Sequence, residues 1–125
     1  MSSQTRVLLV DDSEAILDRV TTVLAPRCSI IGAVTDGVTA LKAAASLHPD
    51  VIVLDISMPG MSGLEVAASL RDAGSTAAVV FLSVHEDEDL MQAARKVGGV
   101  AYISKPHLMI DLVPAVMHAG EHGEI

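Results

Sequence analysis

The sequence is poor in the residues that build covalent, thiolate-metal or aromatic sites. Cys28 is the one cysteine, so an intramolecular disulfide and a cysteine-based metal cluster are excluded, and a small core residue is a better interpretation of it than a reactive thiol. Tryptophan is absent, and Phe81 and Tyr102 are the only aromatic residues. Since half of the 125 residues are hydrophobic, the core must be aliphatic.

Basic residues are also scarce. Eight lysines and arginines stand against sixteen acidic residues, and the net charge of −8 argues against direct nucleic-acid binding by this chain. No apolar run approaches the length of about 20 residues that a membrane span needs. Residues 1–5 are polar and lack the apolar core of a signal peptide. We therefore expect a soluble, cytoplasmic protein with no membrane partner.

Short apolar runs alternate five times with amphipathic stretches. The runs are continuous, as is typical of strands buried on both faces, and they lie at 7–10, 30–34, 51–54, 77–82 and 100–103. Right-handed crossovers between five strand–helix units predict a single-domain (βα)5 protein over residues 6–119. This is a doubly wound, five-stranded parallel sheet in a flavodoxin-like three-layer α/β/α fold. We expect one domain over residues 1–125, with no output domain present.

The last helix contains a proline. Pro114 would break a helix interior but is harmless in a first turn, where its missing N–H has no helical partner. We therefore predict that this helix starts late, near Ile110 or Asp111. The apolar residues expected to face inward are Met109, Leu112, Val113 and Val116.

Polar and charged residues stand where four of the five apolar runs end. Asp11 and Asp12 follow the first run, Asp55 the third, Ser83 the fourth and Lys105 the fifth. Because the carboxyl ends of parallel strands share one edge of the sheet, these residues should converge on one pocket. Each alone is an ordinary cap or turn residue, so it is their joint placement that indicates a site.

Three carboxylates at one place indicate a divalent-metal site. Asp11 and Asp12 would repel Asp55 and raise its pKa unless a cation lay between them. Hard oxygen donors suit Mg²⁺, for which Mn²⁺ is expected to substitute, and the main-chain carbonyl of Ser57 could supply a further ligand. With its charge offset in this way, Asp55 could attack a phosphorus atom in line.

The remaining polar residues suit the binding of a phosphoryl group. Lys105 supplies a positive charge and Ser83 a hydroxyl donor. The Lys105–Pro106 bond is a candidate cis peptide that would aim the lysine into the pocket. His85 has two interpretations: it modulates water access to the phosphoryl group, or it is a surface residue before an acidic helix start.

Four segments together resemble receiver domains of bacterial two-component response regulators, the CheY-like family, over essentially the whole chain. They are VLLVDD at 7–12, VLDISMPGMSG at 53–63, FLS at 81–83 and YISKP at 102–106. Residues 84–87 and 111–116 further resemble receivers of the LuxR/NarL type, which carry a helix-turn-helix DNA-binding domain.

The resemblance implies a signalling role in a phosphorelay. Asp55 would accept a phosphoryl group from a sensor histidine kinase or a phosphotransfer protein, while Asp11 and Asp12 hold Mg²⁺. Ser83 would move to bond that group, and Tyr102, otherwise an ordinary half-buried tyrosine, would turn inward behind it. Such a domain is a phosphoacceptor rather than an enzyme, with Mg²⁺-dependent self-phosphotransfer and slow autodephosphorylation.

The resemblance also implies where the signal leaves the domain. The face made by the fourth helix, the fifth strand and the last helix would control a partner or an absent DNA-binding output domain. A homodimer could form through that face or through the first and last helices. A stand-alone receiver and a receiver cut from a longer regulator are both consistent with the sequence.

Three rival interpretations share this fold class. A haloacid-dehalogenase-type phosphatase needs a second acid two residues after the nucleophile, where this chain has Ser57. A flavodoxin-type cofactor binder needs a neutral phosphate loop, where this chain has Asp11 and Asp12. A phosphorylation-independent pseudo-receiver, working as an interaction module, usually lacks one of the five pocket residues, and all five are present here.

Overall fold

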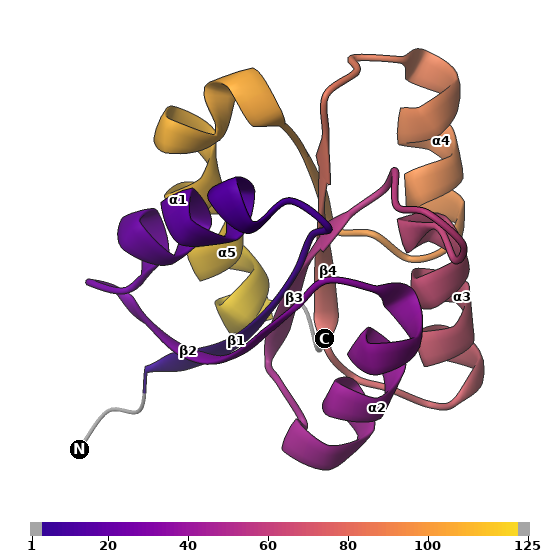
Figure 1. Cartoon of the computed structure of the whole chain (residues 1–125), viewed down its shortest axis with the longest axis horizontal. Coiled ribbons are helices and arrows are strands. Elements are labelled where there is room, and N and C mark those ends of the chain that lie inside the picture. The colour runs from indigo at the N-terminus through magenta and orange to yellow at the C-terminus, as the bar shows by residue number, and fades with distance from the viewer. Residues whose placement is uncertain (1–3, 123–125) are drawn as a thin grey trace.

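Five strands form one parallel sheet in the computed structural model, which describes residues 4–122 (Figure 1). They are β1 (Thr5–Val10), β2 (Cys28–Val34), β3 (Val51–Asp55), β4 (Ala78–Ser83) and β5 (Ala101–Ser104). The order across the sheet is β2-β1-β3-β4-β5, so the order reverses between β1 and β3. All five predicted strands are confirmed, with ends that differ by one or two residues.

Helices cover both faces of the sheet. On one face lie α1 (Glu14–Leu24) and α5 (Leu108–His122), and on the other lie α2 (Gly37–Leu47), α3 (Gly63–Asp72) and α4 (Glu88–Lys96) (Figure 1). The predicted three-layer α/β/α fold is therefore confirmed. Over residues 4–122, no helix has both the length and the apolar character needed to cross a membrane.

The two helical layers explain why the strand sequences are apolar without a break. In β1, Val7 and Leu9 belong to the core under α1 and α5, while Leu8 and Val10 belong to the core under α2 and α3. Successive side chains of a strand point to opposite faces, so a strand covered on both faces needs an apolar residue at every position. Cys28 lies in the first of these cores, as expected, and burial raises the pKa of its thiol.

Side-chain caps start four of the helices. Ser13, Asp36, Ser62 and Asp87 each accept a hydrogen bond from a main-chain N–H in the first turn of the helix that follows. Ser62 also forms a reciprocal pair with Glu65, whose carboxylate accepts from the Ser62 N–H at 3.0 Å. These caps fix where the chain leaves the carboxyl edge of the sheet.

The prediction of a late start for the last helix was wrong. A 3-10 turn, η1 (Lys105–His107), leads directly into α5 at Leu108, so that Pro114 lies in the interior of the helix. The proline is on the exposed side, and the carbonyl that it leaves without a donor belongs to Ile110, which is 77% exposed and open to water. The helix tolerates the proline because the lost bond faces solvent.

The early start also changes which side chains face the sheet. Met109, predicted to face inward, is 58% exposed, and Leu108 is buried in its place. Leu112 and Val116 are buried and Val113 is half-buried, as predicted. A helix that begins at Leu108 presents every third or fourth residue from there to the core.

Candidate functional site

The sheet order brings the predicted site residues to one edge. Asp11 and Asp12 directly follow β1, Asp55 ends β3, Ser83 ends β4, and Lys105 directly follows β5. In the sheet, β3 lies between β1 and β4, and β5 lies beyond β4. The reversal of strand order between β1 and β3 leaves a crevice at their carboxyl ends, which is where ligands bind in open parallel sheets.

Lys105 joins the two buried carboxylates of this edge. Its Nζ lies 2.9 Å from Asp11 Oδ2 and 3.3 Å from Asp55 Oδ1. The side chain of Lys105 is 12% exposed, while those of Asp11 and Asp55 are 1% and 2% exposed. Burial lowers the pKa of Lys105, but the hydrogen bond and charge of Asp11, together with Asp55, raise it above its ordinary value. The lysine is therefore a fixed cation.

One cation does not satisfy all the acidic groups present. Asp11, Asp12 and Asp55 each place a carboxylate oxygen within 4.8 Å of the others. Asp55 Oδ2 is buried and has no hydrogen-bond partner. Burial and the neighbouring charge of Asp11 raise the pKa of Asp55 to about 6, against the lowering effect of Lys105. An unpartnered carboxylate oxygen among hard donors fits a small divalent cation such as Mg²⁺.

Main-chain groups orient both buried carboxylates. The N–H of Ser13 donates to Asp11 Oδ1 at 2.8 Å, and the N–H of Ser57 donates to Asp55 Oδ1 at 3.2 Å. Asp11 Oδ2 is paired with Lys105, whereas Asp55 Oδ2 has no hydrogen-bond partner and remains available to a cation. Ser57 thus has an observed role through its N–H, and its carbonyl as a metal ligand stays a prediction.

Gly63 is a site residue that the sequence reasoning did not single out. A Cβ at this position would lie 2.1 Å from the main-chain oxygen of Asp55, which no packing adjustment short of moving the backbone could relieve. The Gly63 N–H also donates to the Ile56 carbonyl at 2.8 Å. The sequence feature that could have indicated this role is the position of the glycine directly after the Ser62 cap, where the start of a helix can pack closely against the end of a strand.

Ser83 and Tyr102 are both linked to the main chain of His85. The Ser83 hydroxyl, fully buried, accepts from the His85 N–H at 3.1 Å, and the Tyr102 hydroxyl donates to the His85 carbonyl at 2.9 Å. The His85 side chain is exposed. The sequence suggested a role only for the imidazole of His85, whereas in the structure its N–H and carbonyl form the hydrogen bonds.

The prediction of a cis peptide bond between Lys105 and Pro106 was wrong, because residues 4–122 contain no cis peptide bond. Lys105 begins η1, and Pro106 occupies the first turn of that helix, where its fixed φ suits the helical backbone. The lysine reaches Asp11 and Asp55 from a trans backbone.

Known proteins share the sequence pattern of this chain over most of its length. The family model described as "Response regulator receiver domain" matches residues 7–117. The nitrate/nitrite response regulator protein NarL of Escherichia coli (strain K12) is 34% identical over 121 residues, which cover 95% of this chain and 56% of that protein. The transcriptional regulatory protein PdtaR of Mycobacterium tuberculosis (strain H37Rv) is 31% identical, covering 89% of this chain and 54% of that protein. The chain spans about half the length of these relatives.

Solved structures show the same fold. The signal receiver domain of the putative response regulator NarL from Mycobacterium tuberculosis superposes with a TM-score of 0.92 at 28% identity, covering 97% of this chain and 99% of that one. One chain of the CheX–CheY–BeF3–Mg complex from Borrelia burgdorferi superposes with a TM-score of 0.87 at 26% identity, covering 93% of this chain and 89% of that one.

Proposed function

Since the chain belongs to the response regulator receiver domain family, we propose that it accepts a phosphoryl group on Asp55. The observation that carries the proposal is the state of this carboxylate: one oxygen is held by Ser57 N–H and Lys105, and the other is buried and unpartnered. A free oxygen on a fixed carboxylate can attack phosphorus, forming an O–P bond while the donor's leaving group departs with the electron pair.

The neighbouring residues support the transfer. Lys105 would pair with an oxygen of the bound phosphoryl group, in place of part of its present pairing with Asp55. Asp11, Asp12, Asp55 and the Ser57 carbonyl would hold Mg²⁺, or Mn²⁺ in its place, which supplies positive charge for the phosphoryl oxygens. Receiver domains bind Mg²⁺ at an acidic pocket of this kind.

Output begins, in this proposal, at the main chain of His85. A phosphoryl oxygen on Asp55 would attract the Ser83 hydroxyl, which at present accepts from the His85 N–H. When that bond is lost, the His85 peptide can move, and the Tyr102 hydroxyl loses its acceptor. Tyr102 then turns inward, and the face formed by α4, β5 and α5 changes its surface. The added charge would lie only at Asp55, while the change in conformation extends to this face, as in other two-state switches.

The partners follow from the family. Receiver domains interact with histidine kinases or phosphotransfer proteins, and we propose that this chain is cytoplasmic and receives its phosphoryl group from a member of one of these classes. We further propose that the α4-β5-α5 face, or the face formed by α1 and α5, forms a homodimer or contacts an output domain. The domain acts as a signalling phosphoacceptor and not as an enzyme on an external substrate.

Intact-mass spectrometry after incubation with acetyl phosphate and Mg²⁺ tests the central claim. The wild-type chain should gain one phosphoryl group, and Asp55→Asn should gain none, because an amide is not a nucleophile toward phosphorus. Asp72→Asn, which changes an exposed aspartate on α3, is the matched control and should label like the wild type. Labelling that persists in Asp55→Asn contradicts the assignment. A wild-type chain that never labels favours the phosphorylation-independent interaction module.

A further inference from the structure

Helix α4 is held to the domain by little packing. Ala94 is its one fully buried residue, whereas α3 has four, Gly63, Val66, Ala67 and Leu70. A hollow of about 270 Å³ lies between α4 and β5, and another of about 180 Å³ lies between α3 and Val97 and Gly98, which follow α4. Besides Ala94, only the partly buried Leu90 of this helix packs against the core, so the position of α4 depends also on the hydrogen bonds at its ends.

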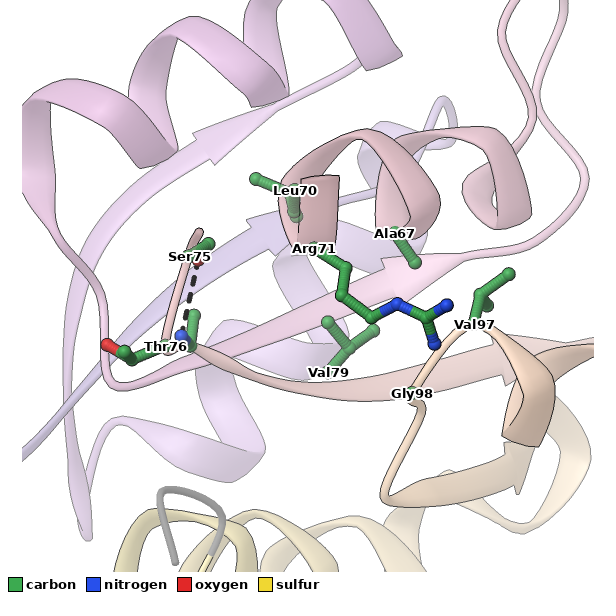
Figure 2. A pocket seen from close by; sticks show the side chains of 9 residues that line it. Ala67, Leu70, Arg71, Ser75, Thr76, Val79, Val97 and Gly98 are labelled. Carbon is green, nitrogen blue, oxygen red and sulfur yellow. Dashed lines mark hydrogen bonds between the residues drawn. The ribbon is translucent and has the colours of Figure 1, made fainter. Parts of the chain in front are cut away.

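The C-terminal end of α4 is anchored to α3 and to the core. Arg71 Nη1 donates to the Lys96 carbonyl at 2.7 Å, satisfying one of the carbonyls that a helix leaves without a partner. Figure 2 shows the Arg71 side chain extended from α3 across Val79 toward Val97 and Gly98. Beyond it, a Cβ on Gly99 would lie 2.6 Å from the Phe81 ring, so the backbone rests directly on a buried side chain.

The N-terminal end of α4 lacks an anchor of this kind. Residues 84–89 are all exposed, and Asp87 caps only its own helix. Among the described residues, the hydrogen bonds that join this segment to the rest of the domain are those from His85 N–H to Ser83 and from Tyr102 to the His85 carbonyl. Both go to a single residue, and both involve side chains whose partners can change.

We propose that α4 is a lever hinged at its C-terminal end, with Arg71 as the clamp that fixes the hinge and Tyr102 as the releasable contact at the free end. When Tyr102 leaves the His85 carbonyl, residues 84–91 move while residues 96–99 stay. The hinge itself is a property of the unphosphorylated domain. Only its use in signalling rests on the proposed function.

Amide hydrogen exchange on the unphosphorylated chain tests the clamp. Arg71→Met keeps the aliphatic stem over the hollow but removes the donor, and it should speed exchange of the Val97, Gly98 and Gly99 amides about fivefold to tenfold, the loss expected for one hydrogen bond. Arg95→Met removes an equal charge from the last turn of α4 and should leave these amides unchanged. Arg71→Lys, which retains a donor, should restore part of the protection.

Tyr102→Phe tests the free end independently. It removes only the hydroxyl and should speed exchange of the amides in residues 88–91 several-fold, with no effect at 97–99. Equal acceleration at both ends, or an Arg71→Met effect no larger than that of Arg95→Met, would overturn the lever. Neither measurement uses a phosphodonor, so a failure of Asp55 to label leaves these outcomes readable, and loss of the lever leaves the labelling result intact.

Discussion

The tightest steric requirement of the site falls on a residue with no side chain. The first turn of α3 meets the end of β3 so closely that Gly63 contacts the main chain of Asp55, the residue whose carboxylate we propose to be phosphorylated. Any side chain there would push the strand end and the helix start apart. The glycine therefore fixes both the packing of α3 and the position of the acceptor.

Gly63→Ala should destabilise the fold by at least about 2 kcal/mol, because backbone has to move to admit the methyl group. Urea denaturation followed by circular dichroism measures the change. Gly32→Ala is the matched control: its Cβ would meet the ends of the Leu8 and Leu47 side chains at 3.1 and 3.4 Å, which can rotate away. A cost at Gly63 no greater than that at Gly32 would show that the close approach is not rigid.

The acceptor carboxylate should reduce the stability of the metal-free domain at neutral pH. Burial, then the charge of Asp11, raises the pKa of Asp55 from 3.8 to about 6, so the folded state binds a proton more tightly than the unfolded state. The stability that the protonated form contributes is present below pH 3.8 and is lost as the pH rises through about 6.

Asp55→Asn, which resembles the protonated form, should therefore stabilise the chain in EDTA by about 1–3 kcal/mol at pH 7.5, and by little below pH 4. Urea titrations at several pH values give the comparison. Asp36 is the control, since a main-chain hydrogen bond from Thr39 lowers its pKa instead. Asp36→Asn should give no gain at pH 7.5, and a gain for Asp55→Asn that does not vary with pH would contradict the buried-charge argument.

At the scale of the elements, α5 contains a proline in its interior that costs one helical hydrogen bond. Pro114 lies inside the helix and leaves the Ile110 carbonyl without its helical donor. Pro114→Ala should raise the free energy of unfolding by about 1–2 kcal/mol, the restored bond and removed clash being partly offset by a more flexible unfolded chain. Met109→Ala, a change at an exposed position of the same helix, should be near neutral in the same denaturation assay. A loss of stability in Pro114→Ala would mean that the proline stabilises the fold despite the lost hydrogen bond.

The elements differ in how well their sequences predict them. The strands could be located because a strand covered on both faces must be apolar throughout, as Val51–Asp55 is up to its last residue. The start of α5 could not, because the rule that places proline in a first turn ignores whether the lost hydrogen bond faces water. Solvent exposure at Ile110 decides that question, and exposure is a property of the folded chain.

The same contrast holds for the site. Its members could be predicted, since each follows a strand and parallel strands end together. Their pairwise contacts could not. These contacts depend on how the helices and loops pack against the sheet. They are the bridge from Lys105 to Asp11 and Asp55, the link from Ser83 to Tyr102 through the His85 peptide, and the bond from Arg71 to Lys96. Sequence spacing shows that these residues gather at one edge, but it gives no signal for which individual side chains and peptide groups form hydrogen bonds or ion pairs there.

At the scale of the whole molecule, the acidic edge couples metal binding to the stability of the domain. Asp11, Asp12 and Asp55 come from two neighbouring strands, so these carboxylates come together only when the sheet is formed. A cation that binds the folded state and not the unfolded chain stabilises the fold by mass action. Asp12 is the exposed member of the group, so it takes little part in the packing of the core.

Mg²⁺ at about ten times its dissociation constant should therefore stabilise the wild-type chain by about 1.4 kcal/mol, or about 3–6 °C in a thermal melt. Asp12→Ala should lose most of this shift while the metal-free protein melts at or above the wild-type temperature, because one source of repulsion is gone. Asp72→Ala, a change to an exposed aspartate at the end of α3, should keep the full shift. An undiminished Mg²⁺ shift in Asp12→Ala, or an equal loss in Asp72→Ala, would place the cation elsewhere or make its effect a general one of ionic strength.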